Sequence, residues 1–393
     1  MARIEAMTGD EIAAEAMRQI NPDVVAAYPI TPQTEIVQNF SQFVANGQVK
    51  TEMIRVESEH SAMSACVGAA AAGARAMTAT CANGLALMWE VLYIAASYRL
   101  PIVMAVANRA LSGPINIHCD HSDSMGARDS GWIQLHSENC QEIYDNLIQA
   151  IKIAENKDVL LPVMVCFDGF IISHGTERVE ILDDEKVKEF IGEFKPQYPL
   201  LDLENPVTYG PLDLFDYYFE HKRQQVDAME KAPSVIKKVG EEYGKISGRS
   251  YGLVEKYNID SSDMVIVAAG STAGTIKATI EEFKEKGVNV GLLKIRTFRP
   301  FPDEEIKDSL KDKACVAVMD RSASFGAVGG PIFSEIRSSL YEEEKRPKVV
   351  NYIYGLGGRE TTMDHIKKVV EDLLNIKRTG KVEKLVNYLG VRE

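Results

Sequence analysis

Three short segments carry side chains that could bind an anion or exchange a proton, and each segment follows an apolar run. Thr31 and Pro32 stand in YPITP, where the Thr31 hydroxyl could donate to a carboxylate at a helix N-terminus. Glu57 and Glu59 stand in VESEHS, at a spacing that places both carboxylates on one face of a strand. Arg109 follows PIVMAVAN and needs either an anionic partner or an exit to water.

Each segment also has a purely structural interpretation. Thr31 as a helix cap, with Pro32 in the first turn, is the simpler one for YPITP, because helix starts are common and anion sites few. A glutamate near a helix start complements the dipole; if buried, the Glu59 carboxyl would have a raised pKa, which suits proton sharing with a ring nitrogen. Arg109 could form a structural salt bridge or clamp a carboxylate in a bidentate manner, and the local sequence leaves both open.

A long loop, residues 111–131, follows the Arg109 segment. It reads LSGPINIHCDHSDSMGARDSG and contains five side chains of metal-ligand type: His118, Cys119, Asp120, His121 and Asp123. Their spacing matches no standard zinc or EF-hand pattern, so the loop is predicted to be an active-site or interface loop. Two glycine turns further on, Gly270–Gly274 and Gly355–Arg359, match no phosphate-loop pattern and are predicted to be tight left-handed turns.

Composition narrows the function classes. The chain has 393 residues, 45% hydrophobic and 26% charged, with a net charge of −13. These values are typical of two or three globular domains, and an acidic chain without a basic stripe argues against nucleic acid or an anionic membrane as partner. None of the six cysteines forms a C-x-x-C pair, so cluster-binding patterns are missing. The N-terminal segment is not a secretory signal, and the apolar runs are of strand length, which together predict a cytoplasmic protein with reduced thiols.

The elements that would position these residues alternate between strands and helices, which predicts an α/β fold with a parallel sheet covered on both faces. The expected strands are Val24–Ile30, Met53–Val56, Ala76–Cys81, Pro101–Ala107 and Val159–Phe167. The expected helices are Pro32–Ala45, Ser61–Ala74, Leu85–Tyr98 and Gln141–Glu155. In such sheets ligands bind outside the carboxyl ends of the strands, where Thr31, Glu59 and Arg109 stand.

The alternation stops between residues 180 and 262 and then returns. The interrupted stretch is charged and aromatic, with a long polar helix expected near Leu214–Tyr243. It is predicted to be a connecting arm that could cover a partner; Phe215, Tyr217, Tyr218 and Phe219 favour packing over a disordered linker.

A second, smaller α/β domain follows. Its expected strands are Met264–Ala269, Asn289–Ile295, Ala314–Met319 and Val349–Ile353, and its expected helices are Thr275–Lys286, Pro331–Leu340 and Met363–Leu374.

Taken together and in this order, YPITP, VESEHSA, VANRALSGPINI, DHSD, RPFP and GLGGR resemble the alpha subunit of pyruvate:ferredoxin oxidoreductases whose enzyme is divided among separate subunits. The resemblance covers nearly the whole chain. It implies a thiamine-diphosphate-binding (pyrimidine-type) domain with its connecting arm over residues 1–245, and a transketolase C-terminal-like domain over residues 246–393. It also implies oxidative decarboxylation of pyruvate with coenzyme A to acetyl-CoA and CO2, with reduction of ferredoxin.

The resemblance assigns roles to individual residues. Glu59 matches the glutamate that hydrogen-bonds the aminopyrimidine ring of thiamine diphosphate and promotes the imino tautomer that deprotonates the thiazolium carbon. Thr31 matches the substrate-binding threonine of YPITP, with Tyr28 and Pro29 in the same cofactor-binding motif. Arg109 matches the arginine that pairs with the pyruvate carboxylate.

What the chain lacks implies partner subunits. It has no cysteine pattern for an iron–sulfur cluster and no G-D-G followed by Asn for magnesium and diphosphate. The resemblance therefore implies a beta subunit that completes thiamine diphosphate and Mg²⁺ binding, iron–sulfur clusters on delta and gamma partners, and an active site at a subunit interface. No metal ligand is expected in this chain. Pyruvate and coenzyme A are the implied small-molecule partners, and ferredoxin docks through the complex.

Two departures bear on specificity. Ala82-Asn83-Gly84 replaces the Ser-Gln-Gly that many relatives carry before the helix at Leu85. NRALSGPI stands where relatives that act on 2-oxoglutarate typically carry QRGGPSTG, which favours pyruvate. The alternatives are the same chemistry on a branched-chain 2-oxo acid or on 2-oxoglutarate, or a non-catalytic assembly subunit. A branched-chain substrate stays open because a hydrophobic pocket separates neighbours differing by a methylene by only about 1–3 kcal/mol.

Overall fold

A seven-stranded sheet carries the N-terminal half of the chain in the computed structural model, which describes residues 3–392. Its strands, in spatial order, are β12 (Thr297–Arg299), β6 (Ile133–His136), β7 (Val163–Asp168), β5 (Val103–Asn108), β4 (Ala76–Thr80), β2 (Val24–Ala27) and β3 (Glu52–Arg55). All neighbours pair in parallel except β12, which pairs with β6 antiparallel. The predicted α/β fold is confirmed.

Helices cover both faces of this sheet, which explains why β4, β5 and β7 are buried along their whole length. One face packs against α1 (Gly9–Ile20), α2 (Thr34–Ala45) and α7 (Cys140–Ala154), with α8 (Asp184–Ile191) and α9 (Tyr218–Ser247) outside them. The other face packs against α3 (Glu59–Ala72), α4 (Ala82–Leu87) and α5 (Trp89–Ser97). The single helix predicted over Leu85–Tyr98 is thus two helices that meet at Met88.

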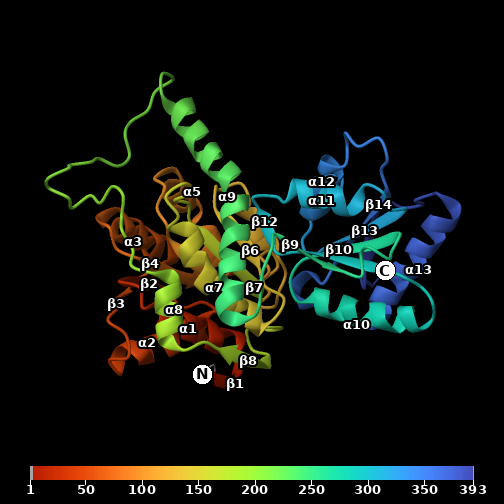
Figure 1. Cartoon of the computed structure of the whole chain (residues 1–393), viewed down its shortest axis with the longest axis horizontal. Helices are drawn as coiled ribbons and strands as arrows, with labels where there is room; N and C mark the ends of the chain where they lie inside the picture. The colour runs from red at the N-terminus through yellow and green to blue at the C-terminus, as the bar shows by residue number, and fades with distance from the viewer. Residues whose placement is uncertain (1–2, 393) are drawn as a thin grey trace.

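A second sheet of six strands lies beside the first (Figure 1). Its spatial order is β15 (Val386–Leu389), β14 (Lys348–Tyr354), β13 (Cys315–Asp320), β10 (Met264–Ala268), β11 (Gly291–Ile295) and β9 (Val254–Tyr257). Helices α10 (Thr272–Glu285) and α13 (Met363–Thr379) cover one face; α11 (Asp303–Leu310) and α12 (Pro331–Ser339) cover the other. A short 3₁₀ turn, η1 (Leu356–Gly358), follows β14.

Three contacts join the parts of the chain. Strand β12 comes from the C-terminal third of the sequence yet extends the first sheet. Strands β1 (Arg3–Thr8) and β8 (Thr176–Ile181) form a separate antiparallel pair. Helix α6 (Ser122–Gly126), within loop 111–131, places Met125 in the core of the second sheet. The two sheets are therefore tied together close to the loop that follows Arg109.

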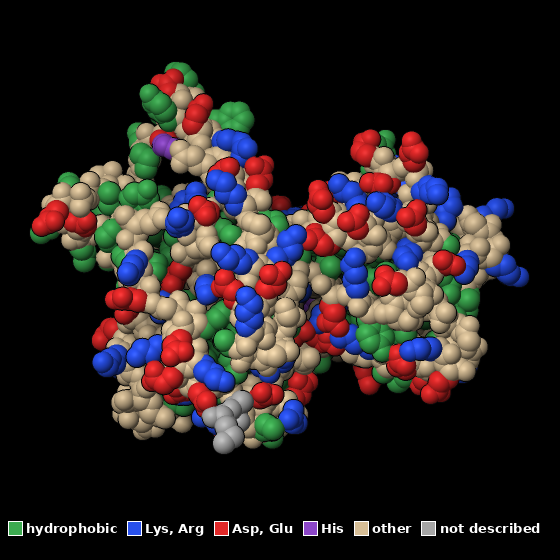
Figure 2. Space-filling view, in the orientation of Figure 1, with side chains coloured by type: hydrophobic (Ala, Val, Ile, Leu, Met, Phe, Trp, Pro, Cys, Tyr) green, Lys and Arg blue, Asp and Glu red, His purple; other side chains and the backbone are tan. Residues whose placement is uncertain are grey.

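The arm, defined here as residues 192–227, leaves the body between α8 and α9 and returns along the first turns of α9 (Figure 1). Phe215 is 92% exposed and Phe219 78% exposed, and Tyr217 and Tyr218 are also exposed. These aromatic side chains therefore do not pack against the rest of the chain, and the prediction that the arm covers a partner stays a prediction. Figure 2 shows hydrophobic and acidic side chains together over the tip of the arm.

No helix within residues 3–392 is both long enough and apolar enough to cross a membrane. All six cysteines are buried, and none forms a disulfide.

Candidate active site

The carboxyl ends of the parallel strands bring the predicted site residues to one edge of the first sheet. Strands β2, β4, β5 and β7 run in the same direction, so the segments that follow them leave the sheet on the same side. Thr31 lies in the segment that follows β2, Gly84 in the segment that follows β4, and Arg109 in the segment that follows β5. Glu59 opens α3, directly after the segment that follows β3.

The YPITP segment is held by Gln33, not by a threonine cap. Helix α2 begins at Thr34 with Gln33 before it, so the structural interpretation of Thr31 as an N-cap is wrong. The fully buried Gln33 side chain accepts a hydrogen bond from the Ile30 amide at 3.1 Å and donates to the Ala79 carbonyl at 3.0 Å. The Thr31 side chain is left exposed, and its hydroxyl makes no hydrogen bond with residues 3–392. Tyr28 and Pro29 are exposed on the same segment.

Glu59 is a buried carboxylate without a partner. It is 6% exposed, and its side chain makes no hydrogen bond or ion pair with residues 3–392. It is the first residue of α3, where the positive end of the helix dipole favours its charge. Glu57, by contrast, is exposed and accepts a hydrogen bond from the Ser61 hydroxyl, which holds the pKa of Glu57 below its usual range. The predicted pair on one strand face is therefore wrong, because β3 ends at Arg55.

Gly84 makes room for the Glu59 carboxylate. A Cβ atom at Gly84 would lie 2.6 Å from Oε1 of Glu59 and 2.5 Å from the hydroxyl of Thr80, closer than real Cβ contacts allow. The Ala82-Asn83-Gly84 segment is the first turn of α4, so it stands inside a helix rather than before one. The sequence marked this segment only as a departure; its packing against Glu59 shows that it shapes the site.

Arg109 is a buried guanidinium without a carboxylate partner. It is 7% exposed, its Nη1 donates to the Thr31 carbonyl at 2.7 Å, and its Nε donates to the Asn116 carbonyl at 2.9 Å. Within the described part of the chain it forms no ion pair, so the structural salt bridge considered from sequence is wrong. A buried cation bound only to neutral carbonyl groups retains donors and charge for an anion.

Asp123 links the segment after β4 to the segment after β5. Its Oδ2 accepts hydrogen bonds from the backbone amides of Arg109 and Ala82, each at 2.9 Å. Its Oδ1 accepts from the Asn108 side chain at 2.7 Å and from the Ser124 amide at 2.7 Å. Burial raises the pKa of Asp123, while these donors favour the charged form. The sequence placed Asp123 in an active-site loop but gave it no role.

The same loop is locked to the second sheet by buried charges. Asp168, at the end of β7, accepts from His121 Nε2 at 2.7 Å and from Arg321 Nη1 at 2.8 Å. Burial opposes ionisation of Asp168, but the charges of Arg321 and His121 outweigh it and hold the pKa of Asp168 well below its usual range. Cys119, His121 and Asp168 lie close enough together to hold a metal ion, yet Arg321 already balances the Asp168 charge. We interpret this group as an ion-pair network between the two sheets.

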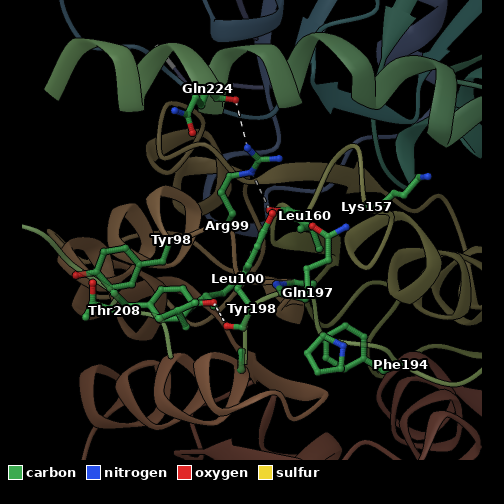
Figure 3. A pocket seen from close by; sticks show the side chains of 15 residues that line it. Tyr98, Arg99, Leu100, Lys157, Leu160, Phe194, Gln197, Tyr198, Thr208 and Gln224 are labelled. Carbon is green, nitrogen blue, oxygen red and sulfur yellow. Dashed lines mark hydrogen bonds between the residues drawn. The ribbon is translucent and has the colours of Figure 1, made fainter. Parts of the chain in front are cut away.

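A well-defined hollow lies away from this edge. A cavity of about 450 Å³ opens beneath the arm, where Tyr98, Arg99, Lys157 and Tyr198 line it (Figure 3). Leu100 and Pro101 also line it; they precede β5, so this cavity lies at the opposite end of that strand from Arg109. It contains none of the predicted site residues.

The fold and this edge define the class of protein. A family model described as pyruvate flavodoxin/ferredoxin oxidoreductase, thiamine diphosphate-binding, matches residues 15–241. A model for pyruvate:ferredoxin oxidoreductase core domain II matches residues 262–366. The chain therefore belongs to the pyruvate flavodoxin/ferredoxin oxidoreductase family.

Particular relatives refine the family. The chain is 60% identical to pyruvate synthase subunit PorA of Thermotoga maritima, covering 99% of this chain and 98% of that one. It is 54% identical to the subunit of the same name from Methanocaldococcus jannaschii, covering 94% and 95%. Ketoisovalerate oxidoreductase subunit VorA of Pyrococcus abyssi is 44% identical, covering 98% and 97%.

Among solved structures, 2-oxoglutarate:ferredoxin oxidoreductase of Magnetococcus marinus matches with a TM-score of 0.73 at 19% identity. The alignment covers 95% of this chain and 65% of that longer one. A split-gene transketolase matches with a TM-score of 0.53 at 13% identity, covering 95% and 100%. At these identities the two likenesses show the fold alone.

The described residues fit the aminopyrimidine end of thiamine diphosphate. Glu59 is a largely buried residue, and its carboxylate has no partner within residues 3–392, so it has acceptor capacity that the chain itself does not use. The missing Cβ of Gly84 keeps the space beside it open. A protonated ring nitrogen or an amino group is a donor from which such a carboxylate accepts.

Proposed function

We propose that this chain is the alpha subunit of an oxidoreductase that converts pyruvate and coenzyme A to acetyl-CoA and CO2 and reduces ferredoxin. One observation carries the proposal: a buried carboxylate and a buried guanidinium, Glu59 and Arg109, meet one edge of a thiamine-family sheet without charged partners. Charged groups that stand on largely buried residues and have no charged partner are candidates for a ligand that completes them. The naming of the 60% and 54% identical relatives as pyruvate synthase subunits supports the substrate.

Glu59 is assigned to cofactor activation. Its carboxylate would hold the protonated ring nitrogen of the aminopyrimidine, and the cofactor held in this way would supply the base that acts at its own thiazolium carbon. Thiamine diphosphate, when bound, supplies the electron sink for decarboxylation. Gly84 keeps a side chain away from the Glu59 carboxylate, and Tyr28 and Pro29 are proposed to form part of the cofactor wall.

Arg109 and Thr31 are assigned to the substrate. The Arg109 guanidinium pairs with the carboxylate of the 2-oxo acid, and the exposed Thr31 hydroxyl donates a further hydrogen bond to it. Asp123 holds the Arg109 backbone amide, which fixes where the side chain starts. These residues bind and orient the substrate; none of them needs to change its own protonation state.

The remaining chemistry is assigned to partner subunits. The six cysteines are buried and dispersed, without the spacing that holds a cluster. We therefore place the iron–sulfur clusters on delta and gamma subunits, and Mg²⁺ and diphosphate binding on a beta subunit that faces this edge. The exposed aromatic side chains of the arm are suited to contact such a subunit, because isolated chains rarely expose apolar groups in such a cluster. Unpaired thiols in all six positions support a cytoplasmic location.

Identities near 45% do not separate pyruvate from branched-chain substrates. The pyruvate synthase subunit of Pyrococcus furiosus is 45% identical to this chain, and the ketoisovalerate subunit of Pyrococcus abyssi is 44% identical. The discriminating comparison is the 60% match to a pyruvate synthase subunit. NRALSGPI after β5 agrees with it.

The test is a substrate panel on the native complex, purified without oxygen through a tag on this chain. Viologen reduction is measured with thiamine diphosphate, Mg²⁺ and coenzyme A, and with pyruvate, 2-oxoglutarate or 2-oxoisovalerate. The proposal predicts the highest kcat/KM with pyruvate and dependence on coenzyme A. A preference for another 2-oxo acid would overturn the substrate, and an intact complex inactive with all three would overturn the reaction.

A further inference from the structure

The GLGGR turn, Gly355–Arg359, contacts loop 111–131 across the boundary between the two sheets. The Asn116 side chain donates to the Gly357 carbonyl at 3.1 Å, and the Gly357 amide donates to Asp120 Oδ2 at 3.2 Å. The Gly358 amide donates to the Cys119 carbonyl at 2.6 Å. From the sequence, this turn is predicted only to be a tight left-handed glycine turn. In the structure it binds the loop that follows Arg109.

Asn116 connects this turn directly to Arg109. Its side chain donates to Gly357, while its backbone carbonyl accepts from the Arg109 Nε at 2.9 Å. The Ala110 amide, next to Arg109, donates to the His118 carbonyl at 3.0 Å, so the two ends of this part of the loop are also joined. A displacement of Asn116 would therefore move an acceptor that aims the guanidinium.

Only glycine fits the two central positions of the turn. Gly357 has φ of +59° and Gly358 has φ of +78°, in the left-handed region that side chains with a Cβ rarely adopt. A Cβ at Gly357 would lie 2.5 Å from Asn116 Nδ2, and one at Gly358 would lie 2.4 Å from the His118 Cβ. The turn and the loop therefore pack so closely that neither Gly357 nor Gly358 has room for a Cβ atom.

We propose that Gly357 is a positioning residue for substrate binding: it seats Asn116, which holds the Arg109 guanidinium where the 2-oxo acid carboxylate binds. Gly358 holds the turn against Cys119 and His118 of the same loop. This inference rests on the proposed role of Arg109. If so, a turn that follows β14 of the second sheet affects substrate affinity without contacting the substrate. Of the loop residues that the turn contacts, Asn116 is the one that bonds the Arg109 side chain, and the link involves no change of charge.

The test compares two glycine substitutions in the assembled complex. Gly357→Ala adds the carbon that meets Asn116. Gly287→Ala is the matched control, because Gly287 has φ of +74° in the same half of the chain and nothing within 4 Å of its ideal Cβ. Both variants carry the same kind of backbone strain. We expect Gly357→Ala to raise KM for pyruvate by about 10-fold or more with a smaller change in kcat, since misplacement by about 1 Å can cost on the order of 100-fold.

Asn116→Ala tests the same link without adding an atom, so it keeps the proposal testable if the glycine variant fails to assemble. It is expected to raise KM for pyruvate, and Gly357→Ala combined with Asn116→Ala is expected to be no worse than the more severe single variant. Gly287→Ala is expected to keep the wild-type KM. A wild-type KM in Gly357→Ala or Asn116→Ala, or fully additive effects, would overturn the inference.

Arg109→Lys, assayed in parallel, separates this inference from the proposed function. A raised KM in Arg109→Lys with a wild-type KM in both Gly357→Ala and Asn116→Ala would leave the function standing and overturn the role of the turn. A wild-type KM in Arg109→Lys would overturn the carboxylate-binding role of Arg109, and this inference with it.

Discussion

Arg109 donates a hydrogen bond from its guanidinium to the backbone carbonyl of Thr31 across 2.7 Å. The two residues follow different strands, β5 and β2, and lie far apart in the sequence. The contact uses the Thr31 carbonyl, so it leaves the Thr31 hydroxyl free to bind another group. A carboxylate bound to both residues would meet a cation and a hydroxyl donor together.

This geometry predicts the effect of Thr31→Val. The substitution keeps the carbonyl that accepts from Arg109 and removes only the hydroxyl. We expect kcat/KM for pyruvate to fall by about 10-fold or more, because a hydrogen bond to a charged group contributes about 1.5–3 kcal/mol. The melting temperature should not change, since Thr31 does not cap α2. A lower melting temperature with unchanged steady-state kinetics would instead assign Thr31 a structural role.

Gly84→Ala should impair the cofactor side of the site. Gly84 lies within α4, so the added methyl group brings no left-handed strain but would lie 2.6 Å from the Glu59 Oε1. We expect turnover in the complex to fall by on the order of 100-fold, and thiamine diphosphate affinity to fall with it.

The control for this substitution is Gly68→Ala. Gly68 lies in α3, and its ideal Cβ has nothing within 4 Å. Alanine there should keep activity and stabilise the helix by about 0.5–1 kcal/mol. Equal activity in Gly84→Ala and Gly68→Ala would contradict the proposed packing of Gly84 against the catalytic carboxylate.

We expect the Asp168 carboxylate to stabilise the folded chain by an amount that depends on pH. The pKa of Asp168 in the folded chain is lowered, because the charges of Arg321 and His121 outweigh the effect of burial. The stabilisation that the Asp168 carboxylate contributes is therefore fully present above its unfolded pKa of about 3.9. It is lost as pH falls from there toward the folded pKa. Asp168→Asn should destabilise the fold by about 3–5 kcal/mol at pH 7, since it leaves Arg321 buried without its partner.

Thermal unfolding of wild type and Asp168→Asn across pH measures this contribution. The difference in melting temperature should stay constant from pH 7 to about pH 5 and narrow below about pH 4. A difference that does not depend on pH down to that value would show that Asp168 stabilises the fold by packing rather than by charge.

The sequence predicted which residues lie at the carboxyl ends of the strands better than it predicted the contacts that those residues make. Apolar runs with β spacing located β2, β4, β5 and β7, and parallel pairing then required Thr31 and Arg109 to leave the same edge. The start of α2 was wrong because Gln33 bonds the Ala79 carbonyl on a neighbouring strand, a contact that local propensity does not carry. Strand β12 was missed because a three-residue strand has no periodicity of its own.

The unpredicted site residues act through partners distant in sequence. Asp123 stands in a loop that the sequence marked as functional, but its bond to the Ala82 amide depends on where α4 begins. Arg321 looks like an ordinary charged residue after a strand until Asp168, 153 positions away, is seen beside it. The aromatic side chains of the arm were predicted to be packed because hydrophobicity reports that a surface is covered, not which chain covers it.

Activation of thiamine diphosphate by Glu59 is the central claim, and deuterium exchange of the thiazolium C2 proton in the assembled complex tests it most directly. Glu59→Gln should slow this exchange by on the order of 100-fold or more, while the complex stays intact with its clusters. Glu57→Gln is the matched control, because Glu57 is exposed two residues away, and it should exchange at the wild-type rate. Exchange at the wild-type rate in an intact Glu59→Gln complex would contradict the account.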